Sequence, residues 1–255
     1  MAFTAFDLGG RTALITGGNS GIGLGMARAL LLAGARVVIW GSNPEKTARA
    51  REQLSAHGDV RAVLCDVGDE QAVDAAFAES VAHLGAIDAC FANAGVSSFS
   101  APIASMSHEE FRRVMRINLD GVFFTFRAAA RHMIERGAGG SLIATASTAA
   151  VEGAARNSHY GASKGAVTSY VRALAVELAR YRIRVNSVLP GWIESDMTAG
   201  VFGEAKFANA VLPRIPLRRW GTADDFGGIA VYLASEASSY MTGADLLIDG
   251  GYTKF

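Results

Sequence analysis

The segment T-A-L-I-T-G-G-N-S-G-I-G, residues 12–23, joins an apolar run directly to a glycine-rich turn. Thr12–Thr16 has the character of a buried strand, and Gly21–Ala33 has the period of a helix. Glycines at such a turn allow positive φ angles and let a ligand approach the backbone closely. The free N–H groups at the start of the helix favour an anionic group such as a pyrophosphate. A strand, this turn and a helix in succession therefore predict a dinucleotide-binding unit.

Short apolar runs alternate with longer segments of helical period along the rest of the chain. Most of the apolar runs are hydrophobic at consecutive positions, which is typical of a parallel sheet covered on both faces. The further strands are expected at Arg36–Trp40, Val60–Leu64, Ile87–Phe91, Ser141–Ala146, Ile183–Leu189 and Ala244–Ile248. The further helices are expected at Pro44–Ala56, Asp69–His83, Ser107–Arg136, Ser158–Arg180 and Thr222–Ser235. Residues 1–255 are thus expected to form a single doubly wound α/β domain, with helices on both faces of a seven-stranded parallel sheet.

The composition argues against several classes of function. The 24 basic and 24 acidic side chains cancel, whereas nucleic-acid binding needs a clustered basic surface. No stretch approaches the roughly 18 apolar residues of a membrane span, and the N-terminal residues do not resemble a secretory signal. The cysteines, Cys65 and Cys90, make no disulfide framework, and the five histidines lack metal-ligand spacing. We expect a cytoplasmic protein that binds no nucleic acid, membrane or metal.

One segment interrupts the alternation of strands and helices. Residues 193–216 follow the end of an expected strand, are rich in apolar side chains and close with Pro213 and Pro216. An insertion beside the carboxyl end of a strand is a typical place for a substrate lid. An ordinary surface helix packed on the core is the alternative.

Further motifs follow the first turn at fixed places. The turn has three residues between Gly17 and Gly21, and with these motifs the chain resembles the short-chain dehydrogenase/reductase family, whose first turn is TGxxxGxG. The matching motifs, in the family's order, are Asn93-Ala94-Gly95, Asn118, Ser147, Tyr160 with Lys164, and Pro190-Gly191. The resemblance covers nearly the whole chain. It implies a Rossmann-like fold and an NAD(P)(H)-dependent oxidoreductase that interconverts a ketone and a secondary alcohol.

Tyr160 and Lys164 carry the chemistry that the resemblance implies. Residues i and i+4 of a helix share a face, so the phenol and the ammonium are expected to point into one cleft. A positive charge about 4 Å away is worth up to ~4 kcal/mol at an effective dielectric near 20. We therefore expect the pKa of Tyr160 to fall by about one to three units from its ordinary value near 10. Tyr160 would then donate a proton in ketone reduction and accept one in alcohol oxidation.

Two more residues complete the implied catalytic set. Ser147 follows an expected strand, at the sheet edge where doubly wound folds bind ligands, and would hold the substrate oxygen. Position alone leaves Thr145 and Thr148 as alternatives to it. By resemblance, Asn118 would hold a water that links Lys164 to solvent, and Lys164 would also bond the nicotinamide ribose.

The family motifs also imply where the cofactor lies. Asp66 and Val67 resemble the pair that holds the adenine, although Asp66 could instead cap the helix that follows. Ser195 stands where the family usually has threonine and keeps the hydroxyl. The expected cofactor-binding residues are Gly17, Asn19, Ser20, Gly21, Ile22, Gly23, Ser42, Asn43, Asp66, Val67, Asn93, Ala94, Gly95, Tyr160, Lys164, Pro190, Gly191, Ile193 and Ser195.

The end of the second strand, Trp40-Gly41-Ser42-Asn43, bears on the choice of cofactor. An acidic residue there would bond the ribose 2′-hydroxyl of NAD and repel the 2′-phosphate of NADP. Gly41 stands where NAD-using relatives often carry that acid, and Ser42 and Asn43 can donate to a phosphate. The basic residue typical of NADP users is missing as well. NADP(H) is favoured, and NAD(H) stays open.

The substrate pocket is expected to be mostly apolar, so the substrate should have a hydrophobic body beside its ketone or alcohol. The expected wall comprises Val96, Ser97, Phe99, Ala149, Ala150, Val151, Trp192, Met197, Val201, Phe202 and Phe207. No basic residue falls at an obvious pocket position to bind a carboxylate. Glu152 and Glu194 could instead favour a basic or hydroxylated substrate, which is a hypothesis only.

Three other functions compete with that of a ketoreductase. Sugar epimerases and dehydratases share the Tyr-x-x-x-Lys spacing but usually carry a longer C-terminal substrate domain. Enoyl reductases place six residues between the tyrosine and the lysine, and Val167 stands at that position here. A non-catalytic nucleotide-sensing protein would be expected to have lost Ser147, Tyr160 or Lys164. The resemblance also implies a homotetramer built from the long helices near Ser107–Arg136 and Ser158–Arg180.

Overall fold

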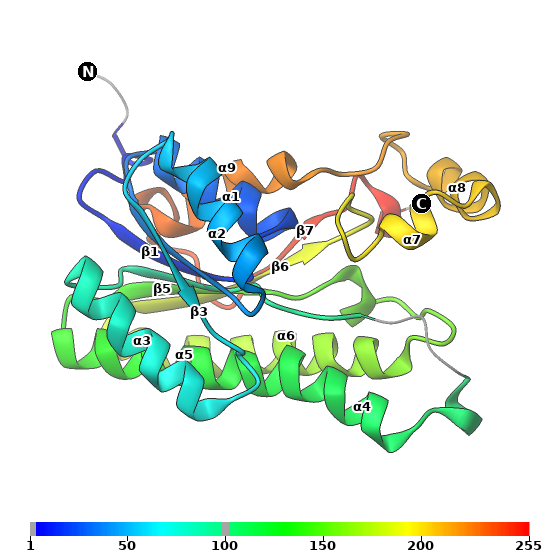
Figure 1. The fold of residues 1–255 in the computed structure, drawn as a ribbon, viewed down its shortest axis with the longest axis horizontal. Coiled ribbons are helices and arrows are strands. Elements are labelled where there is room, and N and C mark those ends of the chain that lie inside the picture. The colour runs from blue at the N-terminus through cyan, green and yellow to red at the C-terminus, as the bar shows by residue number, and fades with distance from the viewer. Residues whose placement is uncertain (1–3, 98–101, 255) are drawn as a thin grey trace.

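Seven parallel strands form one sheet in the order β3-β2-β1-β4-β5-β6-β7 (Figure 1). The structure is a computed structural model that describes residues 4–97 and 102–254, so the predicted pocket residue Phe99 lies outside the described residues. The strands are β1 (Thr12–Thr16), β2 (Arg36–Gly41), β3 (Val60–Leu64), β4 (Ala89–Ala92), β5 (Gly140–Thr145), β6 (Ile183–Pro190) and β7 (Asp245–Ile248). The single domain with a seven-stranded parallel sheet is confirmed.

Helices cover both faces of this sheet (Figure 1). On one face lie α1 (Gly21–Leu32), α2 (Pro44–Ser55) and α9 (Gly227–Ala234). On the other lie α3 (Glu70–Leu84), α4 (His108–Met115), α5 (Gly121–Arg136) and α6 (Ser158–Leu178). Two short helices, α7 (Ala199–Phe202) and α8 (Ala205–Val211), lie beyond the carboxyl ends of the strands. No helix within the described ranges has the length and apolar character needed to cross a bilayer.

One predicted helix is divided in the structure. The expected helix Ser107–Arg136 consists of α4 and α5 joined by a π-helical turn at Arg116–Asp120. A π-turn inserts an extra residue into the helical ladder and is frequent at functional sites. Periodicity alone did not reveal it, because the apolar positions continue on both sides of the turn.

The apolar runs of the strands feed two cores, one on each face of the sheet. In β2, Val38 and Trp40 belong to the core under α3, α5 and α6. The alternate residues Val37 and Ile39 belong to the core under α1, α2 and α9. Successive side chains of a strand point to opposite faces, so a run that is apolar throughout is what a doubly covered sheet requires.

The strand order reverses direction between β1 and β4. The chain winds outward from β1 through β2 to β3, and then returns to pair β4 with the other edge of β1. Crossovers leave in opposite directions from such a point, which opens a crevice at the carboxyl ends of the two strands. The fold therefore places a ligand site beyond Thr16 and Ala92.

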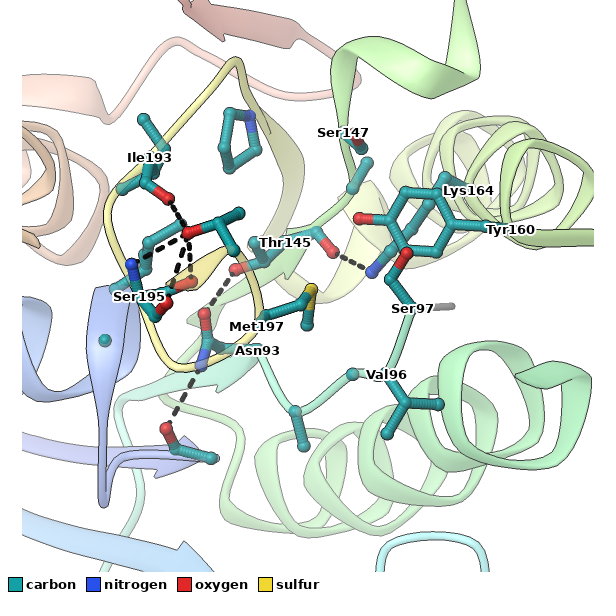
Figure 2. A pocket seen from close by; sticks show the side chains of 18 of the residues that line it. Asn93, Val96, Ser97, Thr145, Ser147, Tyr160, Lys164, Ile193, Ser195 and Met197 are labelled. Atoms are coloured by element: carbon teal, nitrogen blue, oxygen red, sulfur yellow. Dashed lines mark hydrogen bonds between the residues drawn. The ribbon is translucent and has the colours of Figure 1, made fainter. Parts of the chain in front are cut away.

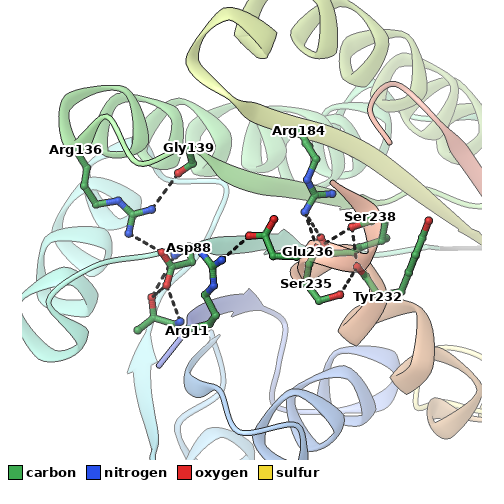
Figure 3. Close-up of polar contacts among 11 residues, drawn as sticks. Arg11, Asp88, Arg136, Gly139, Arg184, Tyr232, Ser235, Glu236 and Ser238 are labelled. Carbon is green, nitrogen blue, oxygen red and sulfur yellow. Dashed lines mark hydrogen bonds and ion pairs between the residues drawn. The ribbon is translucent and has the colours of Figure 1, made fainter. Parts of the chain in front are cut away.

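At the amino ends of the central strands, Asp88 precedes β4 and joins it to its neighbours (Figure 3). One carboxylate oxygen accepts hydrogen bonds from the Thr12 backbone N–H, at 2.9 Å, and the Thr12 hydroxyl, at 3.0 Å. The other oxygen accepts from the Arg136 guanidinium at 2.7 Å, and this guanidinium also donates to the Gly139 carbonyl. Asp88 thereby joins β1, β4 and the end of α5.

Replacing Asp88 with alanine should destabilise the fold without touching the crevice. The substitution leaves the Thr12 donors and the half-buried Arg136 without their acceptor, so we expect Asp88→Ala to lower the free energy of unfolding by about 2–3 kcal/mol. Urea unfolding followed by circular dichroism measures this change. The control Asp59→Ala removes an exposed carboxylate and should change the value by less than about 0.5 kcal/mol. Equal effects of the two substitutions would contradict the assignment.

Candidate active site

A cavity of about 450 Å³ opens at the carboxyl ends of the strands, where the crevice was expected. The predicted site residues that line it are Gly17, Asn19, Ser20, Gly21, Ile22, Ser42, Asp66, Val67, Asn93, Ala94, Gly95, Val96, Ser97, Ser147, Ala149, Tyr160, Lys164, Pro190, Gly191, Trp192, Ile193, Ser195 and Met197. The predicted residues Gly23, Asn43, Asn118, Ala150, Val151, Glu194, Phe202 and Phe207 are not in its lining.

The glycine-rich turn has the shape of an anion cradle. Gly17 has φ +63° and Gly21 has φ +51°, a region of backbone conformation that favours glycine. A Cβ atom at Gly17 would lie 2.9 Å from the Ala94 Cα atom, and one at Gly23 would clash with the Gly17 carbonyl oxygen. Gly23 is thus needed for packing beneath the turn rather than for lining the cavity.

The start of α1 has free donors facing this cradle. Ser20 holds the N-cap position, but its side chain makes no capping hydrogen bond. The first N–H groups of a helix have no partner within the helix, so here they are available to an anion, and the helix dipole favours a negative charge. The residues present therefore fit the pyrophosphate of a dinucleotide.

Asn93 ties together the ends of three strands (Figure 2). Its side-chain N–H group donates to the carbonyl oxygens of Thr16, at 3.1 Å, and Gly17, at 3.3 Å. Its Oδ1 atom accepts from the Thr145 hydroxyl at 3.0 Å. The Thr16 hydroxyl accepts in return from the backbone N–H groups of Asn93 and Ala94. The amide of Asn93 is therefore engaged in holding the cavity open.

Tyr160 and Lys164 lie on one face of α6 and both line the cavity (Figure 2). The Lys164 Nζ atom is 5.7 Å from the centroid of the Tyr160 ring and donates to the Thr145 carbonyl at 2.8 Å. Ser147 follows β5, and its hydroxyl is hydrogen-bonded to the phenol of Tyr160. Tyr160, Lys164 and Ser147 are brought together as the spacing predicted.

The protonation of this group differs from the expectation. Burial raises the pKa of Tyr160 above its ordinary value, and the hydrogen bond from Ser147 offsets only part of this rise. Burial also lowers the pKa of the Lys164 ammonium to about 8. The expectation that Lys164 lowers the pKa of Tyr160 is wrong for the protein alone. Its ammonium donates to the Thr145 carbonyl, and burial is the largest influence on the pKa of both groups.

Asn118 lies in the π-helical turn and is fully buried. Its side-chain amide accepts from the Val96 N–H at 2.8 Å and donates to the Val96 carbonyl at 2.9 Å and to the Ser163 hydroxyl at 3.1 Å. A Cβ atom at Gly95 would lie 3.3 Å from Asn118 Oδ1 and 3.4 Å from Lys164 Nζ. The amide thus fixes the loop after β4 against the catalytic helix.

An acidic side chain at the end of β2 would force its neighbours to move. A Cβ atom at Gly41 would clash with the Asn19 amide and the Thr47 hydroxyl, which are hydrogen-bonded to each other at 3.0 Å. Ser42 lines the cavity as expected, but Asn43 does not. The Asn43 side chain accepts from the Lys46 N–H and caps α2, a role that asparagine favours at a helix start.

Asp66, which also lines the cavity, is held in place by its neighbours. Its carboxylate accepts from the Gly68 N–H and from the Arg116 guanidinium, both at 2.9 Å. Burial opposes ionisation, but these two hydrogen bonds prevail and lower the pKa of Asp66 below its ordinary value. The N-cap of α3 is Asp69, so Asp66 is not the cap of that helix.

The predicted substrate wall is partly wrong. Val151 is 62% exposed and points away from the cavity lining, because the turn after β5 carries it to the surface. Phe202 stacks on Trp220, with ring centroids 4.1 Å apart, and fills an aromatic cluster with Trp192 and Phe207 instead. The side chain of Val201 lies outside what the structure describes.

Several lining residues had not been predicted. Cys65 and Ala146 stand just after strand ends, and the rule that ligands bind there could have found them. Asn157 precedes the catalytic helix, and Tyr252 comes from the C-terminal segment. Neither belongs to a motif, so tertiary structure alone brings them to the cavity.

The segment 193–216 borders the cavity. Its first part contributes Ser195, Asp196 and Met197 to the lining, and the Thr198 hydroxyl donates to the Ile193 carbonyl at 2.7 Å. Asp196 also accepts from the Lys46 ammonium of α2 at 2.7 Å.

Comparison with known proteins gives consistent matches over the full chain. The family model described as enoyl-(acyl carrier protein) reductase matches residues 17–253. L-rhamnose 1-dehydrogenase (NAD(P)(+)) of Azotobacter vinelandii is 36% identical, covering 94% of this chain and 96% of its own. Sorbose reductase of Schizosaccharomyces pombe is 38% identical, covering 97% of each. The crystal structure of a gluconate 5-dehydrogenase from Burkholderia cenocepacia J2315 in complex with NADP and tartrate is 38% identical, with a TM-score of 0.93 over 98% of both chains.

Lys164 should leave a signature in the pH dependence of stability. Its pKa is about 8 in the folded protein against an ordinary value of 10.5, so between these values the unfolded chain binds more protons and stability rises with pH. Going from pH 7.5 to 9.5, we expect the free energy of unfolding of the wild type to gain about 2 kcal/mol relative to Lys164→Met. Urea unfolding of both proteins at the two pH values measures it. Parallel pH profiles would contradict the burial of a charged Lys164.

Proposed function

The chain belongs to the short-chain dehydrogenase/reductase family, and from this membership we propose how its residues divide the work of the reaction. It is an NAD(P)-dependent oxidoreductase that interconverts a ketone and a secondary alcohol, and its relatives are named as dehydrogenases and reductases of sugars and of gluconate. The observation that carries the proposal is the phenol of Tyr160, hydrogen-bonded to Ser147 and beside Lys164 in a cavity that continues to the glycine-rich turn.

In the proposed mechanism Tyr160 moves the proton. A bound nicotinamide supplies the hydride in reduction and takes it up in oxidation. Because burial keeps the phenol protonated at neutral pH, Tyr160 is a ready proton donor to the carbonyl oxygen of a ketone. The Ser147 hydroxyl holds the same oxygen and orients it toward the phenol. Reduction is therefore the direction that the resting protonation state serves.

Lys164 and Asn118 assist this proton transfer without contacting the substrate oxygen. Lys164 is placed to bond the ribose of the cofactor while its bond to the Thr145 carbonyl fixes its position. A pKa near 8 lets its ammonium give up a proton within the physiological range. The side-chain amide of Asn118 is engaged with Val96 and Ser163, so the proposed water would have to be held by its backbone.

NADP is the favoured cofactor, with NAD possible. Relatives are named as NAD(P)-dependent, and the gluconate 5-dehydrogenase structure holds NADP. In this chain, Gly41 removes the acid that would repel a 2′-phosphate, and Ser42 lines the cavity beside it. The remaining proposed contacts are the turn at Gly17–Gly23 for the pyrophosphate, and Asp66 with Val67 for the adenine.

The other functions are less well supported. The name of the matching family model mentions an enoyl reductase, but the lysine lies four residues after Tyr160, and Val167 is a fully buried apolar residue. A nucleotide sensor without catalysis would not need Tyr160, Ser147 and Lys164 together. No observation in the described part of the chain favours an epimerase or dehydratase.

Three wider features belong to the proposal. Residues 193–216 act as the substrate lid, supported by their contribution to the cavity lining. A homotetramer is supported by exposed aromatic side chains on the α4–α6 face, Phe111 and Phe123, which would be covered by another copy. A cytoplasmic location is supported by the free thiols of Cys65 and Cys90, both buried.

The role of Tyr160 predicts different pH profiles for the two directions. Oxidation requires the phenol to lose its proton first, so its kcat should rise between pH 7 and 9.5, while kcat for reduction stays nearly flat. Tyr160→Phe should lower kcat in both directions by at least about 100-fold. Absorbance of the reduced nicotinamide with a panel of ketones and alcohols measures all of these. Equal turnover by the mutant and the wild type would overturn the mechanism.

The end of β2 predicts an unusual result for an engineered acid. Gly41→Asp should not convert the enzyme to NAD but should raise KM for both cofactors, because the new side chain displaces Asn19 from Thr47. We expect at least about a fivefold rise for NAD, equivalent to about 1 kcal/mol. The matched comparison is Ser42→Asp, because position 42 already carries a Cβ atom in the wild type. A lower KM for NAD in Gly41→Asp would refute the steric argument.

A further inference from the structure

Asn157 is a cavity-lining residue with an unmatched hydrogen-bonding atom. Its side chain is 7% exposed, and its Oδ1 atom is buried without a hydrogen-bond partner among residues 4–97 and 102–254. A buried acceptor without a donor is unfavourable, so it gains when a donor enters the site. Asn157 lies three residues before Tyr160, on the same wall of the cavity.

Local structure does not account for this side chain. Asn157 occupies the N-cap position of α6, where asparagine ordinarily accepts a hydrogen bond from the first turn of the helix. Here the side chain makes no such bond, although the Asn157 carbonyl still accepts from the Gly161 N–H. Only the backbone of Asn157 takes part in capping α6, so its side-chain amide is available to another partner.

A second polar atom in the cavity lining is also unmatched. The indole Nε1 atom of Trp192 is buried and has no acceptor within the described residues, and Trp192 lines the cavity. Its ring packs edge-on against Phe207 and Tyr252 and so is fixed in place. The cavity lining therefore includes a buried acceptor, a buried donor and an aromatic side chain. Hydroxyl groups on a carbon skeleton satisfy all three, because they donate and accept while the C–H surface packs on the ring.

The charge of the cavity disfavours an anionic substrate. Glu152 and Asp196 both line it, and Asp196 is already paired with Lys46. Lys164 is the one cation among the described lining residues, and its ammonium is bonded to the Thr145 carbonyl. A substrate carboxylate would meet Glu152 without a free cation to pair with.

We propose that Asn157 accepts a hydrogen bond from a substrate hydroxyl, and that the substrate is a neutral polyhydroxylated alcohol or ketone rather than a sugar acid or the substrate with a hydrophobic body that the sequence led us to expect. This inference rests on the proposed function and adds a substrate class to it. Asn157 is then a specificity-determining residue, because it recognises a hydroxyl away from the reacting carbon. Glu152 adds to this selection by repelling carboxylates.

Three alcohols separate these contributions. Sorbitol and gluconate share a hydroxylated six-carbon chain but differ at one end, where gluconate has a carboxylate, and cyclohexanol carries the reacting hydroxyl alone. Their oxidation with NADP and NAD is followed by absorbance for the wild type, Asn157→Ala and Glu152→Gln. Ser158→Ala, which removes an exposed polar group next to Asn157, is the control. Thermal unfolding of each variant shows whether it is folded at the assay temperature.

The wild type should prefer sorbitol to gluconate. Asn157→Ala should lower kcat/KM for sorbitol by about tenfold and leave cyclohexanol within about twofold, whereas Ser158→Ala should change neither. Glu152→Gln should raise kcat/KM for gluconate by about threefold or more without a similar gain for sorbitol.

Other outcomes overturn the inference. Equal losses for sorbitol and cyclohexanol in Asn157→Ala would show a structural role, and a wild type that prefers gluconate would refute the substrate class. Oxidation of cyclohexanol without oxidation of sorbitol would refute this inference and leave the proposed function intact. Failure to reduce either cofactor with all three alcohols would contradict the proposed function as well.

Discussion

The hydrogen bonds of the Asn93 amide are the constraint on which the site depends. They connect the ends of β1, β4 and β5 at the point where the strand order reverses. The crevice exists because the chain leaves this point in two directions, and the amide keeps the diverging strand ends at a fixed spacing. The glycine-rich turn lies on one side of Asn93, and Thr145, which accepts from Lys164 through its carbonyl, lies on the other. Asn93 therefore fixes both the glycine-rich turn and Thr145, whose carbonyl positions Lys164.

Burial determines the protonation states of Tyr160 and Lys164. It keeps Tyr160 protonated at neutral pH and brings the pKa of Lys164 to about 8. A buried lysine is unfavourable for stability, and it is tolerated here because its ammonium has the Thr145 carbonyl as acceptor. Stability is therefore reduced at the residue where function requires a titratable charge.

The π-helical turn between α4 and α5 links the two ends of the cavity. Arg116, at its start, bonds the carboxylate of Asp66 near the proposed adenine site. Asn118, two residues later, bonds Val96 and Ser163 beside the catalytic helix. One short turn thus contacts both Asp66 and the first turns of α6.

The sequence by itself determined the sheet, the family motifs and the proposed catalytic group of Ser147, Tyr160 and Lys164. These depend on local pattern: consecutive apolar residues in strands, glycines at a turn, and a four-residue helical spacing. Only the tertiary structure decided the protonation of Tyr160, the capping role of Asn43, the outward position of Val151 and the arrival of Asn157 and Tyr252 in the cavity. The physical reason is that burial and pairing depend on residues far apart in the chain, whose distances no local spacing specifies.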